Sequence, residues 1–154
     1  MTNKIKVVGW DVYGTLISSE LDETRDDEDG HELKVRARDG ALEVLGEIRR
    51  RNMIQCTVSD GDLGNLKDNL AEAGINRKIF DDLFIMTWGV PKDFSSVMRV
   101  YRIKPRELLI IGNSYEMDIQ PALEQGCNAL WVPEFIDSVR QRIDVRKVLD
   151  KIWD

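Results

Sequence analysis

The chain has 154 residues, of which 42% are hydrophobic and 32% are charged, and its formal net charge is −6. A chain of this length can bury about 70% of the surface that it exposes when unfolded, so we expect one domain, residues 1–154, that needs no disulfide or metal for stability. No apolar run approaches the roughly 18 residues of a membrane span, and the first six residues are too polar to begin a signal peptide. We therefore expect a cytoplasmic protein without a membrane partner.

The acidic residues are unevenly distributed along the chain. Residues 20–32 contain eight acids and a single base, Arg25, so the remaining chain has 20 acids and 21 bases and a net charge of +1. The acidic balance argues against nucleic acid as a partner. The only histidine, His31, lies in this acidic segment, where we expect a solvated loop residue.

The first third of the chain predicts a strand, an insert and a helix. Residues 5–10 form an apolar run typical of a buried strand, and residues 41–51 place apolar side chains at helical spacing. Between them, residues 16–39 are expected to form an acidic loop and a flap that ends in a strand over 33–38. The basic face of that strand is either solvated, which we favour, or reaches over the site to bind an anion. Its residues are Lys34, Arg36 and Arg38.

The rest of the chain alternates short apolar runs with segments of helical period. The predicted strands are 54–58, 83–86, 108–111 and 129–132, and the predicted helices are 62–73, 93–102, 116–125 and a docked terminal helix within 133–154. Asp62 is the expected N-cap of the first of these helices, and Pro121 predicts an irregular start for the third. Trp10 and Trp131 are expected in the core, whereas Trp88 could border a crevice. The pattern predicts an α/β fold in which a five-stranded parallel sheet is covered by helices on both faces.

The two cysteines, Cys56 and Cys127, each lie inside an apolar run. This placement favours buried thiols in a reducing compartment over a disulfide or a pair of metal ligands.

Polar residues follow four of the predicted strands. Because functional sites of open parallel sheets lie beyond the carboxyl ends of the strands, we expect these residues to meet in one crevice. The segments are Asp11-Val12-Tyr13-Gly14-Thr15, Ser59-Asp60-Gly61, Gly89-Val90-Pro91-Lys92 and Gly112-Asn113-Ser114 followed by Asp118.

These residue types suit an attack on an electrophile that carries negative charge. Asp11 can act as a nucleophile, while Ser59 and Lys92 can bind anionic oxygens. Asp11 and Asp118 can share a hard cation such as Mg²⁺ through oxygen ligands. Glycine at position 14 allows the backbone to approach a phosphate-sized group closely. The candidate substrate-binding residues are Gly14, Thr15, Ser59, Asp60, Gly61 and Lys92.

The four motifs together resemble those of the haloacid dehalogenase (HAD) superfamily, over roughly residues 5–132. The resemblance implies a three-layer Rossmann-like core and hydrolysis through an aspartyl intermediate, with Mg²⁺ as cofactor. Carried over to this sequence, it makes Asp11 the nucleophile and makes Ser59 and Lys92 the pair that orients phosphate and balances its charge. Asp118 would hold the metal. Asn113, earlier in the same motif, would be a second metal ligand. The backbone carbonyl of Tyr13 would complete the metal's protein ligands.

Two positions depart from the phosphatase pattern of that family. Tyr13 stands where phosphatases carry a second Asp that acts as acid and base, and a phenol with an ordinary pKa of about 10 is poorly matched to that task at neutral pH. Asn113 stands where the metal motif usually has Asp, so we expect weaker cation binding. Asp60 and Asp62 are near enough to supply a replacement base, but turn formation by Asp60 and helix capping by Asp62 are favoured.

Three functions follow from these features. The favoured one is a Mg²⁺-dependent phosphatase or phosphotransferase of the capless HAD type, because the intervals between motifs are too short for a large cap. Its open site would accept a phosphorylated small molecule or macromolecule. The alternative is a catalytically weakened or inactive binding or assembly module. A haloacid dehalogenase, which shares the Asp-x-Tyr-Gly-Thr form of the first motif, comes third because nothing here would enclose a small haloacid.

Overall fold

The computed structural model describes residues 5–22 and 32–132. His31, most of the acidic segment and the predicted terminal helix within 133–154 lie outside the described residues. Within the described part of the chain, no helix is both long enough and apolar enough to cross a membrane.

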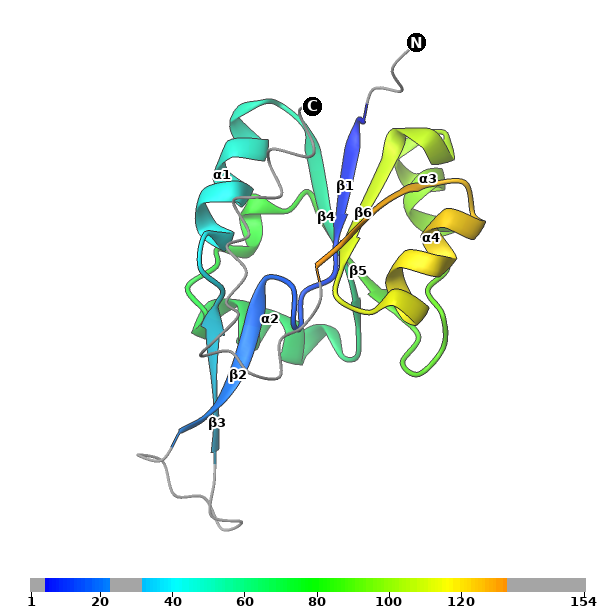
Figure 1. Cartoon of the computed structure of the whole chain (residues 1–154). Coiled ribbons are helices and arrows are strands. Elements are labelled where there is room, and N and C mark those ends of the chain that lie inside the picture. The colour runs from blue at the N-terminus through cyan, green and yellow to red at the C-terminus, as the bar shows by residue number, and fades with distance from the viewer. Residues whose placement is uncertain (1–4, 23–31, 133–154) are drawn as a thin grey trace.

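A five-stranded sheet forms the centre of the fold, and every pair of neighbouring strands in it is parallel. Its strand order is β5-β4-β1-β6-β7, so the first strand along the chain lies in the middle of the sheet (Figure 1). The strands are β1 (Val7–Trp10), β4 (Ile54–Asp60), β5 (Asp82–Met86), β6 (Leu108–Gly112) and β7 (Asn128–Trp131). The predicted parallel sheet is confirmed, and β4 extends two residues beyond the predicted 54–58.

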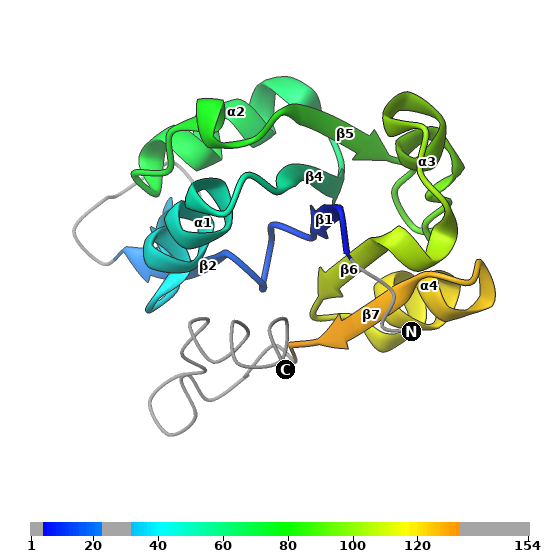
Figure 2. The ribbon, with the colours of Figure 1, turned by 90° about the horizontal axis from the view of Figure 1, so that it is seen from above.

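Helices cover both faces of the sheet and make three layers. The helices are α1 (Ala41–Arg50), α2 (Leu63–Glu72), α3 (Ser95–Tyr101) and α4 (Gln120–Glu124). Figure 2 shows α1 and α2 on one side of the sheet and α3 and α4 on the other. Successive β1 residues face opposite sides, since Val8 packs in the cluster with α1 and α2 while Val7 packs in the cluster with α3 and α4.

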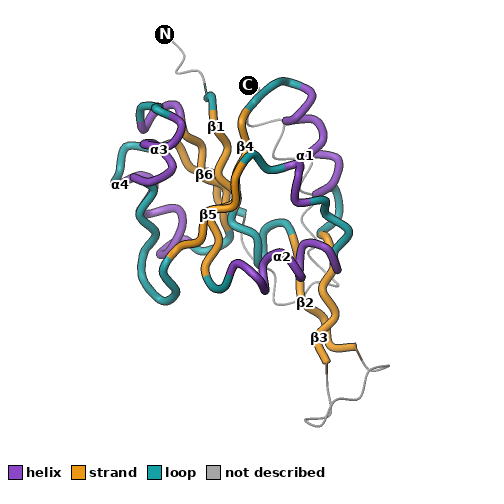
Figure 3. Tube along the Cα trace, turned by 180° about the vertical axis from the view of Figure 1, so that it is seen from behind, coloured by secondary structure: helices purple, strands orange, loops and turns teal. Residues whose placement is uncertain are grey.

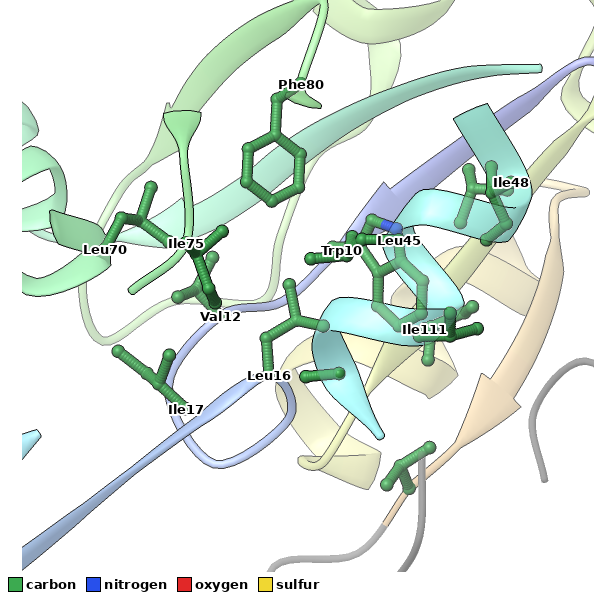
Figure 4. Packing of buried hydrophobic residues seen from close by; sticks show 14 of the residues in the cluster. Trp10, Val12, Leu16, Ile17, Leu45, Ile48, Leu70, Ile75, Phe80 and Ile111 are labelled. Atoms are coloured by element: carbon green, nitrogen blue, oxygen red, sulfur yellow. The ribbon is translucent and has the colours of Figure 1, made fainter. Parts of the chain in front are cut away.

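The larger cluster lies between β1, β6, α1 and α2 (Figure 4). Trp10 and Ile111 from the strands meet Leu45 and Ile48 from α1, and all four side chains are fully buried. Gln55 is also fully buried: its Oε1 accepts from Trp10 Nε1 at 3.2 Å, and its Nε2 donates to Leu45 O at 2.9 Å. The indole therefore has a partner inside the core, as a buried tryptophan requires.

The insert that follows β1 contains a two-stranded antiparallel hairpin, β2 (Ile17–Asp22) and β3 (Glu32–Ala37). Figure 3 shows it extending away from the five-stranded sheet. The strand predicted over 33–38 is present, but residues 17–22, expected within a loop, form its partner strand. Ile17 and Val35 are buried in the larger cluster, which gives this acidic stretch an apolar anchor.

The predicted helix starts can be compared with those of the structure. Asp62 caps α2 as expected, because its Oδ1 accepts from Gly64 N at 2.6 Å. The predicted helix over 93–102 begins only at Ser95, whose backbone N donates to Asp93 Oδ1 at 2.9 Å. The segment before Pro121 is a π-helical turn, Tyr115–Ile119, which agrees with the irregular start expected there.

Trp131 contradicts its predicted place in the core. It lies at the end of the edge strand β7 and is 53% exposed, with its indole Nε1 donating to Asn113 O at 2.9 Å. An edge position leaves one side of the ring uncovered, whereas Trp10 on the central strand is enclosed from every side. Cys56 and Cys127 are free thiols and both are buried, as the sequence predicts.

Candidate active site

The carboxyl ends of the strands bring three of the four predicted motifs into direct contact. Asp11 directly follows β1, Lys92 lies in the loop after β5, and Asp118 lies in the π-helical turn after β6. Lys92 Nζ donates to Asp11 Oδ1 at 2.9 Å and to Asp118 Oδ1 at 2.5 Å. All three residues are buried, so one ammonium joins two carboxylates in a place shielded from water.

Two neighbours fix the orientation of these carboxylates. Thr15 Oγ1 donates to Asp11 Oδ2 at 2.9 Å, and Ser114 N donates to Asp118 Oδ2 at 3.1 Å. Gly112 has no room for a side chain, because a Cβ there would lie 2.5 Å from the Asp118 carboxyl group. The close approach of Asp118 to β6 therefore requires glycine at the end of the strand.

Burial and mutual attraction pull the pKa values of this cluster in different directions. Burial raises the pKa of Asp11 from 3.8 to about 6, although the nearby Lys92 ammonium opposes the shift. Burial lowers the pKa of Lys92, but Asp11 and Asp118 outweigh this effect and leave it above its ordinary value. Lys92 is thus held as a cation, while Asp11 is a more basic carboxylate than one on the surface.

The cluster lies at a cavity of about 480 Å³. Besides the cluster, carboxylates, amides and the rings of Tyr13 and Trp88 line it. The lining residues are Asp11, Tyr13, Asp60, Gly61, Asp62, Asn65, Asn69, Trp88, Lys92, Asn113, Ser114, Met117 and Asp118. Trp88 is 80% exposed and does border the crevice.

Three predicted substrate-binding residues do not line this cavity. Ser59 is fully buried, and its hydroxyl donates to Asp60 O at 3.3 Å. The Gly14 and Thr15 amides are used in the turn after β1, where they donate to Ile17 O and Val12 O. Gly14 adopts the positive φ of 82° that this turn needs. Asp60 and Gly61, by contrast, do line the cavity.

Tyr13 is held by α2. Its hydroxyl accepts a hydrogen bond of 2.7 Å from Asn69 Nδ2, and its backbone bridges to Ile17. The hairpin also contributes at this turn, since the Arg38 guanidinium donates to the carbonyl oxygen of Gly14. Neither contact could be predicted from the local sequence, because 56 residues separate Tyr13 from Asn69 and 24 separate Gly14 from Arg38.

The donors predicted for a cation are all oxygens and all border the cavity. The Asp11 and Asp118 carboxylates carry charge, and Tyr13 and Asn113 offer neutral carbonyl oxygens, a set that suits Mg²⁺ better than a soft metal. Within residues 5–22 and 32–132, no group of three or more His, Cys, Asp or Glu side chains lies together as a metal site. The set therefore fits a hard cation by type, with only two charged ligands.

Gln125 was not anticipated from the sequence. Its Nε2 donates to Lys92 O at 2.8 Å, and its Oε1 accepts from Phe94 N at 2.8 Å. Its side chain therefore binds the backbone of the Lys92 loop at two residues, Lys92 and Phe94. In the sequence, Gln125 is simply the residue before Gly126, and nothing in that pattern predicts a contact with the Lys92 loop.

Comparisons with known proteins give the fold a name. No protein-family model matches the chain, and no similar sequence is found among the curated proteins. Among solved structures, an uncharacterized protein from Listeria monocytogenes serotype 4b matches with a TM-score of 0.72 and 22% identity, over 97% of each chain. A haloacid dehalogenase-like family hydrolase from Streptococcus pneumoniae matches with a TM-score of 0.70 and 15% identity, over 98% of this chain and 99% of that one.

The fold is that of the haloacid dehalogenase-like hydrolases. CbbY from Rhodobacter sphaeroides, solved in complex with phosphate, has the same fold, with a TM-score of 0.65 and 13% identity over 90% of each chain. The three-layer HAD-like core that the motif resemblance implies is therefore present. At these identities the likeness describes the fold, and the activity has to be argued from the site.

Proposed function

We propose that this protein is a HAD-like hydrolase or phosphotransferase that cleaves phosphate esters through an aspartyl phosphate on Asp11. The observation that carries the proposal is the buried Lys92 ammonium, which lies 2.9 Å from Asp11 at the floor of an open cavity. A cation fixed beside a carboxylate nucleophile can neutralise the phosphoryl oxygens as they approach it.

The cluster prepares Asp11 for attack. Thr15 binds one oxygen of its carboxylate and Lys92 binds the other, so the rotamer is fixed before substrate arrives. Burial raises the pKa of this carboxyl group, which makes the ionised form a stronger nucleophile than an exposed carboxylate. Attack on phosphorus forms the Asp11–phosphorus bond and breaks the bond to the leaving oxygen. Water then cleaves the aspartyl phosphate and restores the carboxylate.

Mg²⁺ is the cofactor of this proposal. The residues that would hold it are Asp11, Asp118, Asn113 and the backbone carbonyl of Tyr13, all of which border the cavity. When bound, the cation supplies charge neutralisation at the phosphoryl group. Because Asn113 is neutral, we expect the site to need millimolar rather than micromolar Mg²⁺.

The substrate is proposed to be a phosphorylated small molecule or macromolecule, and the setting to be the reducing cytoplasm. Two buried free thiols and a cavity that opens to the surface support these choices.

The test is turnover of a panel of alkyl and aryl phosphates with Mg²⁺ by the full chain and by Asp11→Asn. We expect phosphate release by the wild type and a loss of at least about 1,000-fold in the variant. The matched control is Asp68→Asn, which removes one exposed carboxylate from α2. The proposal fails if the wild type shows no turnover above Asp11→Asn and no phosphate or beryllofluoride is trapped at Asp11. That result would support the binding or assembly module.

A further inference from the structure

The proposed chemistry needs a group that protonates the leaving oxygen and later activates water. Tyr13 occupies the expected place of that group, but its hydroxyl already accepts a hydrogen bond from Asn69. That contact holds the Tyr13 hydroxyl against α2. Another residue around the cavity must therefore supply the proton, and the following inference rests on the proposed function.

Four carboxyl groups of the described residues line the cavity, and three of them have other tasks under the proposed function. Asp11 is the nucleophile, and Asp118 is bound on both oxygens by Lys92 and Ser114. Asp62 caps α2, where a single oxygen accepts from two backbone amides, those of Gly64 and Asn65. The fourth carboxyl group is that of Asp60.

Asp60 is placed to reach the reacting group. It is the last residue of β4, beside the central strand β1, which ends just before Asp11. Since side chains alternate along a strand, it faces the same side as Val58, which packs with Phe94 just after Lys92. It lines the same cavity as Asp11 and Lys92 and is partly exposed there.

The surroundings of the Asp60 carboxyl group also favour holding a proton. Its Oδ1 is buried and has no hydrogen-bond partner within the described residues. An unpartnered buried oxygen disfavours the charged form, because nothing replaces the water that it has lost. Burial raises the pKa of Asp60, the Asp118 carboxylate raises it further, and Lys92 opposes both. Among the described residues, Asp11, Asp62 and Tyr13 are the other titratable groups that line the cavity.

We infer that Asp60 is the general acid and base of the reaction. It would take the role of the second Asp that phosphatases of the family carry at the position of Tyr13. In the first step Asp11 attacks phosphorus, and the carboxylic acid of Asp60 gives its proton to the leaving alkoxide as the phosphorus–oxygen bond breaks. In the second step the Asp60 carboxylate takes a proton from water as that water attacks phosphorus. The bond to Asp11 breaks, inorganic phosphate leaves, and Asp60 carries a proton again.

The test compares Asp60→Asn with wild type on two kinds of ester. For an alkyl phosphate, whose leaving group needs a proton, we expect turnover to fall about 100- to 1,000-fold. For 4-nitrophenyl phosphate the first step needs no acid, but the second step still lacks its base. Asp60→Asn should therefore release one equivalent of nitrophenolate per enzyme in a burst and accumulate the aspartyl phosphate.

Two further variants separate catalysis from structure. Asp62→Asn changes the neighbouring carboxylate in the same cavity and should show no burst. Asp60→Glu keeps the carboxyl group and should recover at least tenfold over Asp60→Asn. In the wild type, turnover of alkyl phosphates should fall as the pH rises past the pKa of Asp60, and this limb should disappear in Asp60→Asn.

The outcomes are distinct from those that test the proposed function. If the wild type turns over but Asp60→Asn stays within threefold of it on alkyl phosphates, Asp60 is not the acid. If Asp60→Asn loses activity on both esters without a burst, its role is structural and the inference is overturned. A wild type without turnover removes the proposed function and this inference with it.

Discussion

At the scale of single residues, the floor of the cavity buries more negative than positive charge. Asp11 and Asp118 face a single ammonium, that of Lys92, and all three residues are buried. A pKa of Asp11 raised from 3.8 to about 6 corresponds to a loss of about 3 kcal/mol of folding stability at neutral pH. The Asp11 carboxylate is therefore expected to destabilise the fold that positions it.

Asp11→Asn should stabilise the protein. The substitution removes the uncompensated charge and leaves the Lys92–Asp118 pair intact, so we expect the melting temperature to rise by roughly 5–10 °C at pH 7. Because folding raises the pKa of Asp11, its favourable contribution is complete below about pH 4 and is lost as the pH rises through about 6. The gap between variant and wild type should accordingly be small at pH 4 and largest above pH 6.

Thermal unfolding across pH 4–8 measures this gap. Asp68→Asn is the control, since it removes an exposed carboxylate outside the cavity lining and should leave the melting temperature within about 1 °C at every pH. A gap that is constant with pH would show that burial does not perturb Asp11.

At the scale of elements, the Lys92 loop is fixed by contacts from the segment that follows β6. Lys92 N donates to Met117 O at 3.0 Å in the π-helical turn, and Gln125 beyond α4 binds Lys92 O and Phe94 N. These hydrogen bonds join the loop after β5 to the segment after β6, and we expect the position of Lys92 to depend on Gln125.

Gln125→Met tests that dependence. Methionine has a similar volume but no donor, so Lys92 O and Phe94 N each lose a side-chain partner, and we expect the melting temperature to fall by about 3–6 °C. If Lys92 binds phosphate, the affinity for inorganic phosphate should also fall about tenfold, as measured by calorimetry. Gln120→Met removes an exposed glutamine whose side-chain amide donates to Glu124 Oε1 at 3.1 Å, and it should change neither quantity. An unchanged phosphate affinity in Gln125→Met would mean that the loop positions Lys92 without it.

The elements also show what the sequence could predict. The five apolar runs and the Pro121 irregularity are local signals, and both led to the right elements. Strand β2 was missed because Ser18, Ser19 and Glu20 look like loop, and their pairing depends on β3, more than ten residues away. The motif residues Asp11, Lys92 and Asp118 do meet, since parallel strands end at one edge. Ser59 follows the same rule but is enclosed, because its exposure depends on packing that no motif encodes.

At the scale of the whole molecule, the net charge of −6 comes mainly from the acidic segment. Residues 23–29 contain five acids and one base, so their removal would change the net charge to −2. A protein with less negative charge repels a phosphate dianion less, and this effect extends roughly 30 Å at 0.01 M salt but only about 3 Å at 1 M.

Deletion of residues 23–29 should therefore raise kcat/KM for a phosphate ester severalfold at 0.01 M salt, with no difference left at 1 M. The fold should tolerate the deletion, because Asp22 pairs with Glu32 in the hairpin and Gly30 with His31 would remain as a two-residue connection with glycine first. A variant of full length, with the five acids changed to Asn or Gln, separates charge from length. If it matches the deletion, charge governs access of the substrate. If it behaves as wild type while the deletion is faster at every salt concentration, the segment acts by its bulk, and the electrostatic account is wrong.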